Sequence, residues 1–435
     1  MAERITRRAM LQKTAQAGLG FWVARSGMAA QSTQANEKLN LAIVGVAGRG
    51  RGNTDSLISE NIVALCDVDS NYLSVAAKRF LKARTYYDFR KMLDEMDKEI
   101  DAVVVSTPDH THAPASVMAM RMGKNCYCEK PLTHSVNESR VMAQVASERK
   151  IVTQMGTQHH ATSTHRRIVE MVQSGCIGSV KECHVWIGGD RGGGERPTDT
   201  PPIPEHLKWD LWLGPAQYRP YHPDYVPYKW RFWWDFGTGE TGNNGVHIMD
   251  LAFWALNLRH PLSVEAEGPP VHPETSPRWM TVHYEFPARG DSPPLKMAFY
   301  HAKDGPPILS KLIPAAEIPD WESGVLFVGA KGMLLSSYGK WKLLPESDFA
   351  DFQPPQRTIP ESIGHHQEWI VACKGGGPTT CNFDYAGALS EAVLLGNVAY
   401  RVGEKLQWDP TNLKAVNCPQ AERYIRRSYR EGWTL

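Results

Sequence analysis

Four polar residues of this chain have the types and spacing that acid–base chemistry on a hydroxyl group requires. Lys130 stands in the tetrapeptide Glu129-Lys130-Pro131-Leu132, and a second cluster contains Asn243, His247 and Asp250. A lysine can donate a hydrogen bond to a hydroxyl oxygen and favour its alkoxide character, and a histidine can accept the proton that leaves. The two clusters together predict a site that removes a proton from a bound hydroxyl.

The second cluster has the spacing of one helix face. Positions 243, 247, 250 and 254 differ by four, three and four, so a helix would carry all four side chains on one side. We therefore predict a helix from Asn243 onward, on which neighbours of His247 set its orientation and its pKa. A satisfied core or helix-capping histidine is the alternative for His247.

The segments around Lys130 predict that it lies at the carboxyl edge of a parallel sheet. Residues 101–107 have the short β-branched run of a buried strand, and Pro108 ends it. A turn over 109–112, a helix over 114–123 and a second strand over 125–129 follow. Ligands bind at this edge in open α/β sheets, and Pro131 favours extended backbone at Lys130. A solvated surface lysine is the alternative.

A glycine-rich segment predicts a nucleotide-binding turn. A buried-strand pattern over 39–45 leads into Gly45-Val46-Ala47-Gly48-Arg49-Gly50-Arg51-Gly52. Glycines let the backbone approach a pyrophosphate at a helix N-terminus. Alanine stands at position 47, where the strict fingerprint has glycine, and it is the smallest substitute. The predicted cofactor contacts in this loop are Gly45, Ala47, Gly48, Arg49 and Gly50.

The strand pattern over 61–67 ends in Asp67, which lies 22 residues after Gly45 (67 − 45). An acid at this offset hydrogen-bonds the adenosine ribose hydroxyls, which favours NAD. Arg49 and Arg51 lie near enough in sequence to supply a phosphate clamp, so NADP stays open as the alternative.

These segments resemble the Gfo/Idh/MocA family, which includes glucose-fructose oxidoreductase and inositol dehydrogenase. The matching residues are 45–52, 66–69, 106–112, 129–131, 156–159, 245–250, 373–375 and 408–410. The resemblance covers nearly everything after residue 38. It implies an α/β fold class, with an N-terminal Rossmann dinucleotide-binding domain and a C-terminal α/β domain that has a largely antiparallel open sheet.

The expected domain organisation follows from this resemblance and from strand-like and helix-like patterns. We expect a signal and linker over 1–37, a Rossmann domain over 38–160, and a substrate-binding and oligomerisation domain over 161–435. In the last domain, strand patterns cover 180–187, 279–286, 296–300 and 324–328, and helix patterns cover 365–373 and 386–401. The Gly- and Pro-rich residues 188–204 predict a long surface loop. The family sheet suggests a homodimer or homotetramer.

The resemblance also implies residue roles. His247 matches the acid/base histidine, Lys130 the lysine that bonds the reacting oxygen, and Asp250 a position that binds substrate hydroxyls. Asn243 departs from the family, which more often has aspartate there. Asparagine can orient the imidazole but cannot stabilise an imidazolium by charge, so it is open whether the usual proton relay operates.

Further cofactor and substrate contacts complete the predicted site. The segment with His110 and His112 lies against the nicotinamide half of the cofactor in this family. The predicted cofactor contacts beyond the glycine loop are Asp67, Thr107, Pro108, His110, His112, Glu129 and Lys130. The predicted substrate contacts are Gln158, Asp250 and Trp234, the last because indole faces suit pyranose rings, with core packing as its alternative. The histidine pairs at 159–160 and 365–366 are expected either to line the substrate cleft or to lie on the surface.

The composition indicates which classes of binding partner to expect. The net charge of +1 gives no indication of a nucleic-acid partner, and no apolar run reaches the length of a membrane span. The eight cysteines form no Cys-x-x-Cys pair and no zinc spacing, so no metal is expected. Whether Cys373 and Cys381 form a disulfide is left open.

The N-terminus carries a separate pattern. Thr6-Arg7-Arg8-Ala9-Met10-Leu11 precedes a mildly apolar stretch, with small residues around Ala30. This resembles a twin-arginine export signal, and a basic disordered start is the alternative. The expected location is the periplasm, or the cytoplasm if the signal does not act. An exported protein would need to hold NAD tightly, because the periplasm offers no free nicotinamide pool.

Three functions are therefore carried forward. The first is hydride transfer between a secondary hydroxyl of a sugar, glycoside or cyclitol and NAD(P). The second is a redox-assisted glycoside hydrolase, in which transient oxidation acidifies a neighbouring C–H and allows elimination. The third is a sugar- or nucleotide-binding protein without turnover, which only Asn243 mildly favours.

Overall fold

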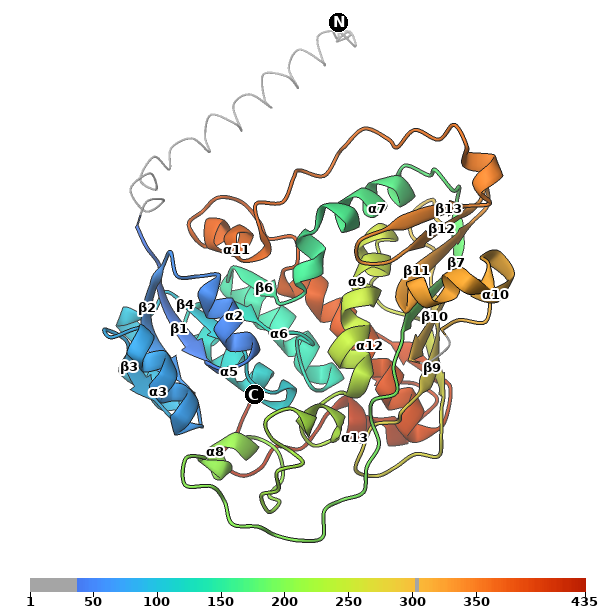
Figure 1. Cartoon of the computed structure of the whole chain (residues 1–435). Coiled ribbons are helices and arrows are strands. Elements are labelled where there is room, and N and C mark those ends of the chain that lie inside the picture. The colour runs from blue at the N-terminus through green and yellow to red at the C-terminus, as the bar shows by residue number, and fades with distance from the viewer. Residues whose placement is uncertain (1–36, 302–304) are drawn as a thin grey trace, which may run out of the picture.

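The computed structural model describes residues 37–301 and 305–435, and it consists of two sheets with helices between and around them (Figure 1). The export signal predicted over 1–37 lies, except for its last residue, outside the described residues. No helix among the described residues has the length and hydropathy that crossing a bilayer would need.

The first sheet has six parallel strands in the order β3-β2-β1-β4-β5-β6. Its strands are β1 Asn40–Val44, β2 Asn61–Cys66, β3 Arg84–Tyr86, β4 Ala102–Val105, β5 Asn125–Cys128 and β6 Thr153–Met155. Its helices are α2 Arg49–Asp55, α3 Ser70–Arg79, α4 Phe89–Glu95, α5 Asp109–Arg121 and α6 Val136–Arg149. All four residues of β4 are buried, because helices cover both faces of a parallel sheet. The strand order reverses between β1 and β4, which is where such sheets bind ligands.

The second sheet has nine strands in the order β13-β12-β11-β7-β10-β9-β8-β14-β15, and every neighbouring pair except β7–β10 is antiparallel. Its strands are β7 Val180–Ile187, β8 Ser263–Glu267, β9 Met280–Phe286, β10 Leu295–His301, β11 Ser323–Gly329, β12 Met333–Ser336, β13 Trp341–Leu344, β14 Leu406–Asp409 and β15 Lys414–Ala415. The predicted fold class, a Rossmann sheet followed by a largely antiparallel α/β domain, is confirmed. Residues 188–204 contain no helix or strand, as predicted.

The longest helix, α12 Phe383–Val402, runs between the two sheets (Figure 1). It packs on α6, on β8 and on α9 Val246–Ala255, and α9 in turn packs on α7 Ser163–Gln173. The remaining short helices are α8 Trp209–Leu213, α10 Leu309–Leu312 and α13 Glu422–Ile425. Helix α11 His365–Cys373 returns to the first sheet, where Trp369 and Ile370 join a core with Leu41 and Ile43 of β1. Residues late in the chain thus complete the core of the first sheet.

The start of α5 differs from the sequence prediction. The turn expected over 109–112 is instead the first turn of the helix, which begins directly after Pro108 and contains Pro114. Proline has no backbone N–H, so the carbonyl of His110, four residues earlier, loses its helical donor. Arg427, near the C-terminus, donates to that carbonyl instead. The proline was therefore a poor indicator of where this helix begins.

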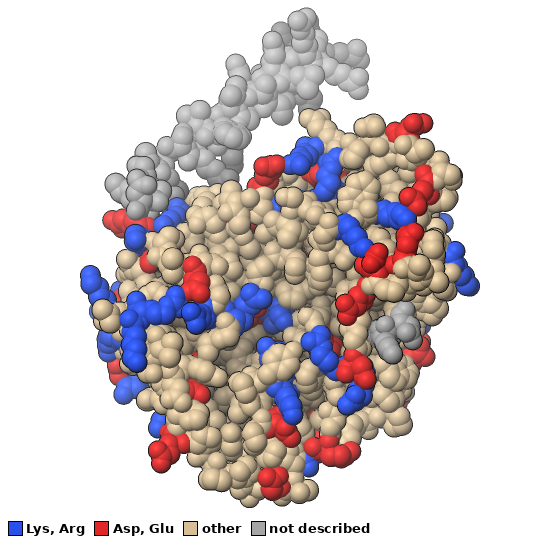
Figure 2. Space-filling model, in the orientation of Figure 1, with Lys and Arg blue, Asp and Glu red and all other residues tan. Residues whose placement is uncertain are grey.

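The C-terminal tail lies against the first sheet's helices (Figure 1). The Trp433 ring lies 5.9 Å from that of Phe89, and the guanidinium of Arg90 stacks on it at 4.1 Å. Arg121 donates to the Leu435 carbonyl at 2.9 Å. On the face shown in Figure 2, basic and acidic side chains are interspersed, in agreement with the net charge of +1.

Candidate active site

The glycine turn after β1 is tightly packed on its inner side. Gly45 has a φ of 85°, and a Cβ there would lie 2.7 Å from the carbonyl oxygen of Ser106. A Cβ on Gly50 would lie 1.9 Å from the carbonyl oxygen of Gly45, so both positions require glycine. Gly48 has a φ of 53° and open space where a Cβ would be. The predicted loop contacts, Gly45, Ala47, Gly48, Arg49 and Gly50, thus form a turn with an open outer surface, and this fits a pyrophosphate.

Asp67 lies beside the glycine turn, at the end of β2. Its Oδ2 accepts a hydrogen bond from the Val46 backbone N–H at 2.9 Å, and its Oδ1 accepts one from that of Asp69 at 3.0 Å. Burial raises the pKa of Asp67 to about 6, although these backbone hydrogen bonds act to lower it. Backbone donors, one of them from the glycine turn, therefore hold this carboxylate in place.

Asn53 of α2 connects the glycine turn to the residues after β5. Its Nδ2 donates to Oγ of Ser106 and to Oε1 of Glu129, both at 3.0 Å. Its Oδ1 lies 3.0 Å from Nε2 of His366, in α11. Sequence analysis did not single out Asn53, because a polar residue inside a short helix carries no pattern that predicts long-range contacts.

Glu129 and Gln158 contact each other. Nε2 of Gln158 donates to Oε1 of Glu129 and to the Tyr127 hydroxyl, both at 2.9 Å. Gln158 lies in a 3₁₀ helix, Gln158–Ala161, three residues after β6 ends. A Cβ on Gly156 would lie 2.5 Å from the carboxylate of Glu129, so glycine there leaves room for that side chain. The amide of Gln158 is thus already engaged on one side by Glu129.

Lys130 and Asn243 meet although 113 residues separate them. Nζ of Lys130 donates to the backbone carbonyl of Asn243 at 2.6 Å and to its Oδ1 at 3.1 Å. Nδ2 of Asn243 donates to Oε1 of the buried Glu240 at 3.1 Å, and Arg191 pairs with Glu240 at 3.0 Å. Asn243 lies in a π-helical turn, Thr241–Gly245, that precedes α9, so the regular α-helix predicted from 243 begins only at 246.

The surroundings of Lys130 affect its protonation. Burial lowers the pKa of Lys130, while the carboxylates of Glu129 and Asp109 act to raise it. Burial likewise raises the pKa of Asp109, whose Oδ2 accepts a hydrogen bond from Thr238 at 2.7 Å. Buried polar groups of both signs therefore surround the ammonium group. Asp109 lies within 106–112, one of the segments that resemble the family. Its position in the sequence did not indicate that its carboxylate would act on Lys130.

His247 lies in the first turn of α9, close to His159. Its Nδ1 is buried and makes no hydrogen bond with any described residue. The His159 ring meets it edge-on at 5.5 Å and stacks on Tyr338 at 4.0 Å. Burial, followed by the charge of Lys130, holds the pKa of His247 well below its usual value. At neutral pH the imidazole is therefore uncharged and able to accept a proton.

Asp250 lies deeper than a substrate-facing residue would. It is 0% exposed, and its carboxylate lies 2.9 Å from Nδ1 of His160 and accepts from the Tyr385 hydroxyl at 2.6 Å. His160 stacks on Trp254 at 3.9 Å. The side chains at 247, 250 and 254 share one face of the helix, as their spacing predicted, and this face contacts His159 and His160.

His110 and His112 are buried in the first turn of α5, between Pro108 and Pro114. Both ring nitrogens of each histidine lie within 3.2 Å of backbone carbonyl oxygens. These carbonyls belong to Phe236 and Trp212 for His110, and to Pro131 and Thr107 for His112. The rings thereby tie the segment after β4 to the Lys130 loop.

Trp234 lies apart from the Lys130 and His247 cluster. Its indole N–H donates to the His272 carbonyl at 3.2 Å, and the guanidinium of Arg401 lies 4.9 Å from its ring. The tryptophans at 209, 212, 230 and 233 form a separate buried cluster. For most of these indoles, core packing is therefore their observed role.

The cysteines and their neighbours are not arranged as a disulfide. All eight cysteines are free thiols, including Cys373 and Cys381. Ligand atoms of His160, Asp250 and Cys381 lie within 4.8 Å of one another. Both carboxylate oxygens of Asp250 and Nδ1 of His160 are already paired, so hydrogen bonds account for this group.

Comparisons with known protein families agree with this architecture. Residues 39–157 match an oxidoreductase family with a NAD-binding Rossmann fold, and residues 184–291 match the C-terminal α/β domain of the same family.

Curated relatives match only part of the chain. An inositol 2-dehydrogenase of Rubrobacter xylanophilus is 30% identical over 150 residues, which cover 33% of this chain and 42% of that enzyme. A levoglucosan dehydrogenase of Pseudarthrobacter phenanthrenivorans is 28% identical over 116 residues, which cover 27% of this chain and 29% of that enzyme. The matches thus span less than half the length of these relatives.

A solved structure matches over most of the chain. The WlbA dehydrogenase from Bordetella pertussis, in complex with NADH and UDP-GlcNAcA, superposes with a TM-score of 0.61. The match covers 86% of this chain and 99% of that chain at 16% sequence identity. At this identity the likeness shows the fold alone.

Proposed function

The chain belongs to the Gfo/Idh/MocA oxidoreductase family, and from this premise we propose that it transfers a hydride between a secondary hydroxyl of a sugar, glycoside or cyclitol and NAD. The observation that carries the proposal is the hydrogen bonding of Lys130 to Asn243, in the turn that leads into the helix of His247, in a fold whose glycine turn fits a dinucleotide. The curated relatives named inositol and levoglucosan dehydrogenase support the substrate class.

The glycine turn, Asp67 and Glu129 would hold the cofactor. When bound, the nicotinamide would supply the acceptor for a hydride. The protein's part is to bind the carbohydrate with its reacting carbon against that ring and to keep bulk water out.

Lys130 and His247 would act on the reacting hydroxyl. Nζ of Lys130 donates a hydrogen bond to the hydroxyl oxygen and so favours its alkoxide form, while Asn243 fixes the direction of the ammonium group. The neutral imidazole of His247 accepts the hydroxyl proton at a ring nitrogen. Both ends of the Asn243 amide are engaged, Oδ1 by Lys130 and Nδ2 by Glu240, so this side chain positions Lys130 and takes no part in the transfer of the proton.

The stacked pair His159 and Tyr338 supports a carbohydrate at this position. The His159 ring lies beside His247 and stacks on Tyr338, and flat ring faces suit the apolar faces of a sugar. Gln158, held by Glu129, would hydrogen-bond the cofactor or a sugar hydroxyl with its remaining groups.

NAD is the proposed cofactor in preference to NADP. The carboxylate of Asp67, beside the glycine turn, would accept hydrogen bonds from the ribose hydroxyls and repel a 2′-phosphate. Isothermal titration with NAD and NADP separates the two, since a tighter complex with NADP would contradict this preference.

Export by the twin-arginine route, tight retention of NAD, and assembly as a homodimer or homotetramer complete the proposal. Fractionation of cells that express the full chain, with Arg7→Lys and Arg8→Lys together as control, tests export. Nucleotide content after purification and light scattering test the other two statements. A cytoplasmic protein that purifies free of nucleotide as a monomer would contradict all three.

The decisive test of function is absorbance of the purified protein at the reduced-nicotinamide band during addition of hexoses, glycosides and inositols, with Lys130→Ala as control. A band that grows with one class and is absent in the control supports the dehydrogenase. Cleavage of a glycoside with no net band would instead favour the redox-assisted hydrolase, and bound nucleotide with neither reaction would favour a binding protein.

A further inference from the structure

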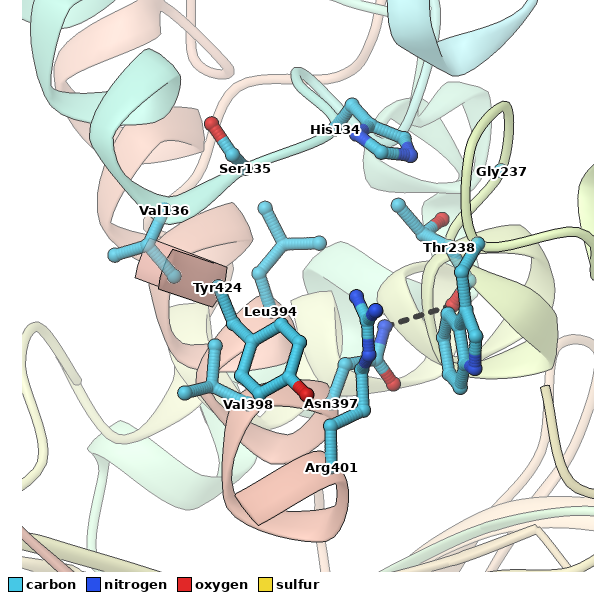
Figure 3. A pocket seen from close by; sticks show the side chains of 11 residues that line it. His134, Ser135, Val136, Gly237, Thr238, Leu394, Asn397, Val398, Arg401 and Tyr424 are labelled. Atoms are coloured by element: carbon cyan, nitrogen blue, oxygen red, sulfur yellow. Dashed lines mark hydrogen bonds between the residues drawn. The ribbon is translucent and has the colours of Figure 1, made fainter. Parts of the chain in front are cut away.

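A cavity separate from the Lys130 and His247 cluster lies where the two sheets' helices meet. Figure 3 shows its lining, which comes from the start of α6, from the segment before the π-helical turn, and from α12 and α13. The lining residues include His134, Trp234, Thr238, Asn397, Arg401 and Tyr424. The empty space between them, including the part open to solvent, is about 310 Å³.

Arg401 projects into the middle of this cavity (Figure 3). Its guanidinium lies 4.1 Å from the ring of Tyr424 and 4.9 Å from that of Trp234. Within residues 37–301 and 305–435, no carboxylate lies within 4.0 Å of it. Stacking uses the faces of a planar guanidinium and leaves its five N–H donors pointing outward in the plane. The aromatic rings therefore fix the orientation of a cation whose hydrogen-bonding edge has no protein acceptor.

His134 is the second polar group without a partner at the cavity. Both of its ring nitrogens are buried, and neither makes a well-formed hydrogen bond to a described residue. Burial, followed by the charge of Arg427, holds the pKa of His134 well below its usual value, while a weak contact with the Trp234 backbone acts to raise it. A neutral imidazole retains one N–H, which the cavity offers as a donor.

The nearby carboxylates are already paired. Asp235 lies 2.7 Å from Arg219, and Glu138 pairs with Arg427 at 2.8 Å. Glu138 also accepts from the backbone N–H groups of His134 and Ser135, at 3.0 Å and 2.9 Å. Neither acid is therefore free to neutralise Arg401, and the positive end of the 14-residue helix α6 adds to the local potential.

We propose that this cavity binds one small tetrahedral oxyanion of the phosphate or sulfate class, held by the guanidinium edge of Arg401 and by a ring N–H of His134. A planar guanidinium is well matched to two oxygens of such an anion, and the half-buried Arg401 forms no salt bridge with a described carboxylate that would compete for it. The anion would join α6, which belongs to the first sheet, to α12 and α13, which come late in the chain. Its binding would therefore stabilise the packing between the two halves of the protein.

The test is isothermal titration of inorganic phosphate into the full chain, in chloride buffer at constant ionic strength and with NAD at saturation. The NAD keeps phosphate out of the glycine turn. We expect saturable binding of one phosphate, which sulfate displaces. Arg401→Gln should weaken it by about tenfold or more, because a charged hydrogen-bond pair is lost.

Arg423→Gln is the matched control. Arg423 stacks on the same tyrosine, with its guanidinium 4.6 Å from the ring of Tyr424, but it is exposed and does not line the cavity. The Arg423→Gln protein should bind phosphate with the same affinity as the unmodified protein. If Arg401→Gln fails to fold, His134→Phe tests the same cavity by filling it without a donor.

Two results would overturn the proposal. One is the absence of saturable phosphate binding to the unmodified protein at millimolar concentrations. The other is binding that survives both Arg401→Gln and His134→Phe, or that is lost in Arg49→Gln, which would place the anion at the glycine turn.

Discussion

Nζ of Lys130 donates to two oxygens of Asn243, the backbone carbonyl at 2.6 Å and Oδ1 at 3.1 Å. The side chain of Asn243 in turn donates, through Nδ2, to Oε1 of Glu240 at 3.1 Å. Asparagine is thus the bridge between a half-buried ammonium and a buried carboxylate. An aspartate, which the family more often has at this position, could accept from Lys130 but could not donate to Glu240.

Replacement of Asn243 by aspartate should therefore destabilise the protein. The change places two carboxylates side by side and removes a donor, so we expect the free energy of unfolding to fall by about 1–3 kcal/mol. Chemical denaturation at pH 7 measures it. Glu240→Gln in the same chain should restore most of the loss, because the glutamine can donate to the new aspartate. Equal stability of N243D and the unmodified protein would show that the Glu240 contact is unimportant.

Lys130→Met should abolish turnover without loss of stability. Turnover falls because the donor to the reacting oxygen is gone, and stability holds or rises because a half-buried cation, whose charged form burial disfavours, is removed. Since burial lowers the pKa of Lys130, its unfavourable effect on stability is fully present below the folded pKa and is relieved as pH rises toward 10.5. The advantage of K130M in thermal unfolding should therefore shrink with rising pH. Lys98→Met, at an exposed lysine, should change neither property.

His247→Asn should lower kcat/KM by about 10²–10⁴, the usual range for a lost general base. The pKa of His247 is lowered well below 6.5, so its uncharged form persists into mildly acid solution. We expect the acid limb of the kcat/KM profile to lie below pH 6.5 and to vanish in H247N. A limb at or above pH 7 that persists in H247N would assign the base to another residue.

The sequence predicted most of the helices and strands that position these residues, because the patterns that form them depend on residues close together in the chain. Strands such as β1 and β4 carry continuous apolar runs, and the glycines at 45 and 50 are demanded by backbone contacts that any Rossmann turn makes. Helix α5 was misjudged at its start, because the donor that compensates for Pro114 is Arg427, more than 300 residues away.

Side-chain partners across the two halves could not be predicted in the same way. Asn53 is an ordinary polar residue in sequence, and only the fold brings it to Glu129, just as only the fold brings Lys130 to the carbonyl of Asn243, 113 residues away. Trp234 and Asp250 were predicted as substrate contacts from residue type and spacing. These two properties indicate the face of a helix or the composition of a segment. Spacing does not tell whether a neighbouring histidine or tyrosine already fills that face.

Asp250→Asn should affect stability far more than substrate affinity. The carboxylate is completely buried and pairs with His160 and Tyr385, so loss of its charge should cost about 3–5 kcal/mol. Burial is the largest single influence and acts to raise the pKa of Asp250, but His160, His165 and Tyr385 together outweigh it and the net shift is downward. The contribution is therefore present above the unfolded pKa and is lost as pH falls through the folded pKa. Denaturation of D250N between pH 3 and pH 7 measures it.

Asp384→Asn is the control for Asp250, because that carboxylate forms an exposed pair with Arg259. Exposed pairs contribute about 0–1 kcal/mol, so D384N should unfold almost like the unmodified protein. A D250N protein that is fully stable and binds substrate weakly would return Asp250 to the substrate-contacting role that its spacing suggested.

Affinity for NAD should depend on pH through Asp67. Burial raises its pKa to about 6, so near that pH the carboxyl group is half protonated before a ribose binds. Ribose hydroxyls donate best to the ionised form, and the Kd for NAD should therefore rise as pH falls from 7 to 5. Asp67→Asn should bind NAD weakly with no pH dependence over this range, because an amide does not titrate. If the unmodified protein and D67N have parallel Kd curves, another group governs the pH dependence and the ribose contact lies elsewhere.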